Sequence, residues 1–127
     1  MANSEEMAWL AGLLEGEGSF GLKMSGKGPA AVRNVPVVKV AMKDLDVIHK
    51  AHAVAGFGTV ATCKPNSSGC VMHVWQSVDR ERVPQLLREL LPWMGSRRGE
   101  AIREVLSKAA PYGWDGTKRS LRVAIIG

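Results

Sequence analysis

Near the start of the chain, one predicted helix carries a small residue at every fourth position. Ala8, Gly12 and Gly16 recur within residues 4–16, and this spacing puts them on one face of the helix. Each glycine in a helix interior costs about 1 kcal/mol relative to alanine. Small residues at this spacing let two helix backbones approach closely, and no second predicted helix has the pattern. We therefore expect the partner helix to come from a second copy of the chain.

The same helix has clear boundaries. Asn3 and Glu6 have the spacing of a capping box at its start, and Gly18 ends it. Its larger residues supply the apolar surface that anchors the helix to its own core: Trp9, Leu10, Leu13 and Leu14.

Downstream, the period of the apolar residues alternates between that of strands and that of helices. The predicted elements are strands 19–24 and 35–42, a helix from Asp44 to Gly56, strands 57–64 and 70–77, a helix 79–91 stopped by Pro92, and a last helix capped by Ser96. The order α-β-β-α-β-β-α-α predicts an α+β fold in which four antiparallel strands carry the helices on one face. The other face is left open for a ligand.

The length of 127 residues allows one hydrophobic core and no separate recognition module. We expect one domain at 1–110, followed by a tail at 111–127 whose pattern leaves three options: an edge strand, a docking segment or partial disorder. No apolar run approaches the roughly 20 residues of a membrane span, and no signal peptide opens the chain. The protein is therefore expected in the cytoplasm or nucleoid of a prokaryote or phage-infected cell, or in an organelle, and not to be secreted.

The cysteines and histidines do not point to a metal site. Cys63 and Cys70 flank a polar hairpin tip and are expected to face each other across two strands as free thiols. Two cysteines without a histidine cluster cannot build a tetrahedral zinc site. His49 and His52 are interpreted as helix-surface or packing residues.

A formal net charge of +5 favours a polyanionic partner, because phosphates neutralised by Lys or Arg release condensed counterions. In the first strand Phe20 and Leu22 share one face, while Ser19 and Lys23 take the other. The same alternation proposes a set of DNA contacts: Ser19, Lys23, Ser25, Lys27, Arg33, Asn34, Lys39, Lys64 and Gln76. Lys and Arg would set phosphate register or read guanine, and Asn or Gln could read adenine.

A different interpretation of these residues is that the lysines only keep the sheet soluble. His73 and Trp75 share one face of their strand, but the sequence does not decide whether that face points to the core or to the ligand.

Glu17 lies at the C-terminal tip of the helix that carries the small residues. A twofold axis along that stripe would bring the two Glu17 carboxylates together beside two negative helix ends, which is electrostatically unfavourable. A divalent cation resolves the conflict, and oxygen ligands of this kind suit Mg²⁺. Glu15 points elsewhere around the helix and is interpreted as structural or exposed.

The stretch Leu10–Gly18, LAGLLEGEG, resembles the LAGLIDADG motif of homing endonucleases. Two later stretches are similar to landmarks of the same family: VKVAMKDLDVI with GFGTV around the second helix, and LLPWMGSRRGEAI before the last one. The three landmarks occur in the expected order and cover about residues 5–108.

This resemblance implies a LAGLIDADG fold whose basic, saddle-shaped sheet lies in the DNA major groove. A chain with one motif is expected to act as a homodimer on a long, near-palindromic double-stranded site, cutting across the minor groove to leave 3′ cohesive ends. Glu17 falls on the family's metal ligand and the carbonyl of Gly16 on a second metal oxygen. The expected cofactor is Mg²⁺, with Mn²⁺ as an alternative and Ca²⁺ as a non-productive ion.

Two positions depart from the family pattern. The basic catalytic residue after the leucine-proline turn is best matched by Arg97, with Arg98 second, and Met42 stands where relatives often have a polar side chain. An arginine keeps its proton, so it can stabilise charge but cannot act as a base. Besides an endonuclease, the sequence therefore allows a non-cleaving DNA- or RNA-binding protein, such as a repressor or splicing cofactor, and an interaction domain that binds no polyanion.

Overall fold

The computed structural model describes residues 3–25, 28 and 32–109, without the side chains of residues 25, 32 and 33. The elements are α1 (Ser4–Glu17), β1 (Gly18–Ser25), β2 (Val32–Met42), α2 (Leu45–Ala55), β3 (Thr59–Thr62), β4 (His73–Val78), α3 (Arg82–Leu90), the 3-10 helix η2 (Leu91–Trp93) and α4 (Ser96–Lys108). The predicted α+β class and element order are confirmed. Lys27 and the predicted tail at 111–127 lie outside the described residues.

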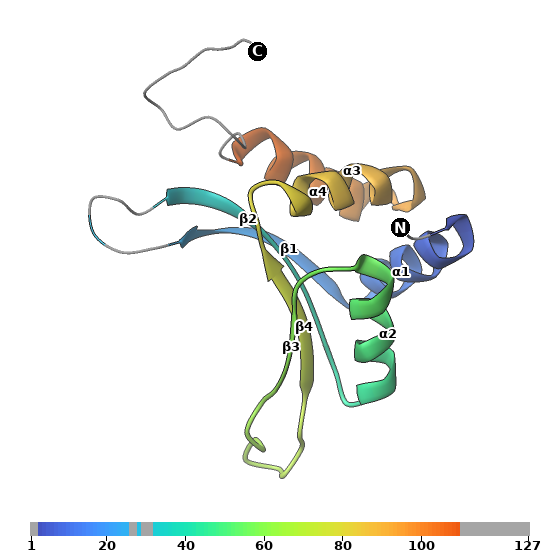
Figure 1. The fold of residues 1–127 in the computed structure, drawn as a ribbon, viewed down its shortest axis with the longest axis vertical. Coiled ribbons are helices and arrows are strands. Elements are labelled where there is room, and N and C mark those ends of the chain that lie inside the picture. Colours follow the sequence, from blue (N-terminus) through green and yellow to red (C-terminus); the bar gives the residue numbers. More distant parts are fainter. Residues whose placement is uncertain (1–2, 26–27, 29–31, 110–127) are drawn as a thin grey trace.

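The four strands form one antiparallel sheet in the order β1-β2-β4-β3, with the helices on one side of it (Figure 1). Among the layer contacts, α4 packs on β1, α3 on β2 and α2 on β4. No helix within the described ranges is both long enough and apolar enough to span a membrane.

Strand side chains alternate between the helical layer and the opposite face, which we call the open face. Val38 and Val40 are buried, whereas Lys39 between them is exposed. Trp75 lies opposite Val40 and is fully buried, and its indole N–H donates to the carbonyl of Phe57 at 2.9 Å. His73 and Trp75 therefore face the helical layer, which the sequence alone did not decide.

Helix α1 follows its predicted boundaries. The Asn3 side chain accepts from the Glu6 amide and the Glu6 side chain accepts from the Asn3 amide, so the capping box is confirmed. The helix ends at Glu17, and the Gly18 amide donates to the carbonyl of Leu14. Its buried residues contribute to the main core: Met7, Leu10, Ala11 and Leu14.

The second hairpin is shorter than predicted. Strand β3 ends at Thr62 and β4 begins at His73. Between them the Asn66 side chain organises the tip by accepting from the amides of Ser68 and Cys70. The amide of Cys63 donates to the carbonyl of Met72 at 2.8 Å. This register puts Met72 opposite Cys63, so the expectation that Cys63 faces Cys70 is wrong. Both cysteines are free thiols, as predicted.

The last two helices begin at different residues from those predicted. The Asp79 carboxylate accepts from the amides of Glu81 and Arg82, which holds a turn ahead of α3 and delays its start to Arg82. In α4, Ser96 is the first helical residue and Gly95 is the N-cap. The prediction that Ser96 caps this helix is wrong, because Ser96 already has helical geometry and therefore lies inside the first turn.

Candidate nucleic-acid interface and metal site

One row of polar side chains crosses all four strands on the open face. Ser19 lies opposite Lys39, Lys39 lies opposite Gln76, and Gln76 lies opposite Thr59. We call these four residues the polar row. Ser19, Lys39 and Thr59 are exposed and Gln76 is half-buried, so all four side chains are accessible to a ligand that lies across the sheet.

A shallow depression of about 300 Å³ lies over the same part of the sheet. Its lining includes Ser19, Lys39 and Gln76 from the polar row together with Lys23 and Val37. The strand register and the alternation with buried neighbours place these five side chains on the open face. Lysine, serine and glutamine side chains on one surface can hold phosphates and read base edges.

The other predicted DNA contacts lie around this surface. Lys64 is exposed beyond the end of β3. Asn34 is exposed at a register irregularity of the first hairpin, and its backbone is in the left-handed region with φ 59°. Ser25 and Arg33 lie on β1 and β2, but their side chains are not described, and Lys27 is outside the described residues.

Thr59 was missed by the sequence analysis. A lone threonine at the start of a short strand carries no signal of its own, because only the register of β3 against β4 aligns it with Gln76. The expected hairpin of the third and fourth strands places Thr59 near Gln76. Only the observed pairing of β3 with β4 shows that these two residues lie directly opposite each other.

The tip of α1 combines an acid with a small-residue surface. Glu17 and Gly16 are both exposed at the end of the helix. A Cβ atom added at Gly12 or Gly16 would meet nothing within 4 Å. The described part of one chain therefore gives no steric reason for glycine at either position.

Three hydrogen bonds hold the end of α1 against the start of α4. The Arg98 guanidinium donates to the carbonyls of Glu15 and Gly18, at 3.0 and 2.6 Å. In the opposite direction, the Gly95 amide donates to the Glu15 carboxylate at 2.8 Å. We call this set the α1–α4 lock. The Glu15 carboxylate thus satisfies the amide of Gly95, the N-cap of α4, whereas no side chain at the N-cap position makes a capping hydrogen bond.

The lock also balances the dipoles of both helices. The last turn of α1 contains no basic residue and the first turn of α4 contains no acidic one. Arg98 supplies the missing cation at the negative end of α1, and Glu15 supplies the missing anion at the positive end of α4. The predicted structural role of Glu15 is consistent with this geometry.

The two departures from the family pattern occupy different environments. Arg97 is exposed, whereas its neighbour Arg98 is half-buried and reaches the α1 tip. Met42 is half-buried, packs against the core cluster and lies opposite His73. Met42 thus belongs to the helix-covered side of the sheet.

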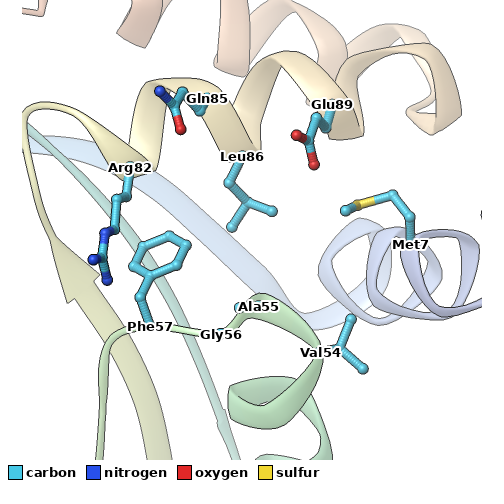
Figure 2. Close-up of a pocket in the computed structure, with 9 residues that line it drawn as sticks. All are labelled: Met7, Val54, Ala55, Gly56, Phe57, Arg82, Gln85, Leu86 and Glu89. Atoms are coloured by element: carbon cyan, nitrogen blue, oxygen red, sulfur yellow. The ribbon is translucent and has the colours of Figure 1, made fainter. Parts of the chain in front are cut away.

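A larger pocket of about 470 Å³ opens on the helical layer (Figure 2). Met7, Val54, Phe57 and Leu86 give it apolar walls, and charged side chains of α3 stand along its rim, as Figure 2 shows. The pocket lies among the helices and so is separate from the polar row, which is on the other side of the sheet.

Sequence comparisons find no match: no protein-family model and no curated protein resembles the chain. Among solved structures, the homing endonuclease I-CvuI, in complex with its target in the presence of Ca, has a TM-score of 0.66 at 18% identity, over 83% of this chain and 68% of that one. The group I intron-encoded homing endonuclease I-CeuI, complexed with DNA, has a TM-score of 0.63 at 19% identity, over 84% of this chain and 55% of that one.

A third similar structure is that of a protein named as a LAGLIDADG homing endonuclease. The LAGLIDADG homing endonuclease I-GzeII, in complex with its DNA target, has a TM-score of 0.61 at 10% identity, over 84% of this chain and 36% of that one. These likenesses agree with the motif at Leu10–Gly18 and with the sheet described above. The chain therefore has the fold of the LAGLIDADG homing endonucleases.

Proposed function

We propose that two copies of this chain form a site-specific, Mg²⁺-dependent endonuclease for double-stranded DNA. The observation that carries the proposal is the position of Glu17. This acid is exposed at the tip of α1 and stands two residues before Ser19, where the polar row begins. A duplex lying along the open face therefore passes the acidic tip. The solved structures of I-CvuI and I-CeuI, which contain DNA, support the choice of partner.

The glycines of α1 support a homodimer. Each interior glycine costs the helix about 1 kcal/mol relative to alanine, yet a Cβ at Gly12 or Gly16 has open space around it. Ala8, Gly12 and Gly16 would let the α1 helices of two copies approach closely. A twofold axis between them would present two identical open faces to the halves of a near-palindromic site.

The ligands at the α1 tip fit Mg²⁺ only when they are shared between two copies. The Glu17 carboxylate and the Gly16 carbonyl are oxygen donors of the kind Mg²⁺ prefers. Within the described part of one chain, no three His, Cys, Asp or Glu side chains are grouped to hold a metal. Mg²⁺ needs only one or two carboxylates and takes water and phosphate oxygens as well. Two Glu17 side chains beside a DNA phosphate meet this requirement, with Mn²⁺ as a substitute and Ca²⁺ supporting binding alone.

Different residues of the chain have different roles in the proposed hydrolysis. Lys23 and Lys39 hold phosphates on the open face. The α1–α4 lock fixes the direction of the helix tip, so that Glu17 keeps a constant position relative to the DNA. A bound divalent cation would supply an activated water and stabilise the leaving oxygen. Arg97 is exposed and permanently charged, so it can offset negative charge on the reacting phosphate.

Digestion of a plasmid library in Mg²⁺, with a parallel binding assay in Ca²⁺, tests the proposal. The Glu17→Gln variant keeps the size of the side chain and removes its charge. We expect it to retain DNA binding in Ca²⁺ and to lose cleavage in Mg²⁺. Glu100→Gln is the matched control, because Glu100 is an exposed acid on α4, outside the proposed site. It should cut like the unmodified chain.

Two results would count against the nuclease. Selective binding without cleavage in Mg²⁺ or Mn²⁺ would indicate a non-cleaving DNA- or RNA-binding protein on the same fold. Equal cleavage by the Glu17→Gln variant would remove this acid from the metal site.

A further inference from the structure

The open face carries apolar side chains on both sides of the polar row. On one side Val37 lies opposite Val78. On the other side Ala41 lies opposite Val74, and Val74 lies opposite Ala61. We call these five residues the apolar rows. Their alternation with buried neighbours such as Val40 and Trp75 places them on the face away from the helices.

The apolar rows are accessible in the described part of the chain. Ala61 is exposed and the other four residues are half-buried. Val37 lines the same depression as Lys39 and Gln76. All the described helices pack on the other face. These methyl groups are therefore available to a ligand that also touches the polar row.

The charged side chains on the open face indicate the chemistry of its ligand. Strand residues that point to the open face include Lys23 and Lys39 and no acid, within the described strands. The ligand must therefore combine negative charge with apolar groups at short intervals. The DNA major groove offers this combination through its phosphates and the C5-methyl groups of thymine. An apolar protein surface would offer methyl groups but nothing to neutralise the lysines.

We propose that the apolar rows read thymine methyl groups, so that the preferred half-site has A·T pairs on both sides of the base pairs read by the polar row. This inference rests on the proposed function, because it needs DNA on the open face. Successive rows are roughly 6.8 Å apart along a strand, which equals about two base-pair steps of 3.4 Å. The A·T pairs are therefore expected about two steps from the centre of the polar contacts.

The experiment uses the full chain and a random duplex library in Ca²⁺, where cleavage is not required. Retained duplexes are sequenced, and the Kd of one of them is compared with that of the same duplex carrying deoxyuridine in place of individual thymines. This exchange removes one methyl group and leaves base pairing intact. We expect the Kd to rise about fourfold for each methyl that the apolar rows bury. Thymines elsewhere in the duplex should tolerate the exchange.

A pair of variants assigns the effect to the sheet. Val74→Thr replaces a methyl group on the open face by a hydroxyl of similar size, and Val47→Thr makes the same change on α2 in the helical layer. For Val74→Thr, the Kd of the deoxyuridine duplex divided by the Kd of the thymine duplex should move toward one at the affected thymines. Val47→Thr should leave the ratio unchanged, and thermal unfolding of both variants shows that they fold.

The outcomes separate this inference from the proposed function. If no duplex is selectively retained, the proposed function and the inference fail together. If selected duplexes bind equally well with thymine and deoxyuridine, the inference alone is wrong. If Val74→Thr instead changes the sedimentation behaviour of the protein and leaves the Kd ratio untouched, the apolar rows are a protein interface and the inference is again wrong.

Discussion

The junction of α1 and β1 requires glycine at position 18, because there is no space for a side chain. Its φ of −80° is open to any residue, but an added Cβ would lie 2.7–2.9 Å from the side chain and backbone of Leu14. Three residues further on, a Cβ at Gly21 would meet nothing within 4 Å. The junction determines where Glu17 ends the helix and where Ser19 begins the polar row.

The variants Gly18→Ala and Gly21→Ala should therefore differ in stability. We expect Gly18→Ala to lower the free energy of unfolding by about 1–3 kcal/mol, because neither the Leu14 backbone nor its buried side chain can move away freely. Gly21→Ala should leave it unchanged or raise it by about 0.5 kcal/mol through the unfolded state. Chemical denaturation measures both values, and equal effects would contradict the steric argument.

Neighbouring arginines have different roles at the end of α1. Arg98 bonds to the carbonyls of Glu15 and Gly18, whereas no such bond of Arg97 is found among the described residues. Arg98→Met should lower the free energy of unfolding by about 2 kcal/mol, because two hydrogen bonds from a charged donor are lost in a half-buried place. Arg97→Met is the control and should change it by less than about 0.5 kcal/mol. A result in which both variants unfold alike would mean that the lock adds no stability.

At the scale of the elements, α1 has three surfaces with separate tasks. One side is buried in the core, the end is locked to α4, and the small-residue stripe is left without a described neighbour at Gly12 and Gly16. The first two surfaces fix the helix within its own chain. The third is therefore free to meet a second copy in the proposed dimer.

Replacing Gly12 by leucine tests that dimer. The leucine should not disturb the fold, because the space around Gly12 is open, but it would hold two α1 backbones apart. Sedimentation should show a dimer for the unmodified chain and a monomer for Gly12→Leu. Ala53→Leu, at an exposed position of α2, is the control and should remain dimeric. An unchanged dimer in Gly12→Leu would exclude the proposed interface.

At the scale of the whole molecule, the two faces of the sheet separate stability from recognition. The helical layer holds the core, with Trp75 and Val38 fully buried, while the open face holds Lys39 and Gln76. Substitutions on the open face should therefore change DNA binding with little effect on folding. The formal net charge of +5 adds a long-range attraction to any polyanion.

The salt dependence of DNA binding distinguishes the lysines from the glutamine. Lys39→Met should weaken binding to all duplexes and reduce the slope of log K against log salt by about 1 for each copy of the chain, because one phosphate contact per copy is lost. Gln76→Ala should leave the slope unchanged and relax the preference at one base pair. Lys108→Met, at the end of α4, should affect neither quantity. A slope that stays constant in Lys39→Met would show that Lys39 does not neutralise a phosphate.

The sequence by itself determined the order of the elements and the course of the first helix. The capping spacing of Asn3 and Glu6, the acid at Glu17 and the stripe at Gly12 are local patterns, and local hydrogen bonding and side-chain period dictate their outcome. Alternation in the strands also separated Lys39 from its buried neighbours correctly. These features depend on residues within a few positions of one another.

Only the tertiary structure decided which distant residues meet. The Gly95 amide donates to the carboxylate of Glu15, which is 80 residues away. Thr59 joins the polar row only through the register of the second hairpin. Cys63 and Cys70 appeared to face each other, but the hydrogen bond from Cys63 to Met72 offset them. Such pairings depend on strand register and on helix ends brought together by the core. They arise from packing between segments, which the period of a single segment does not encode.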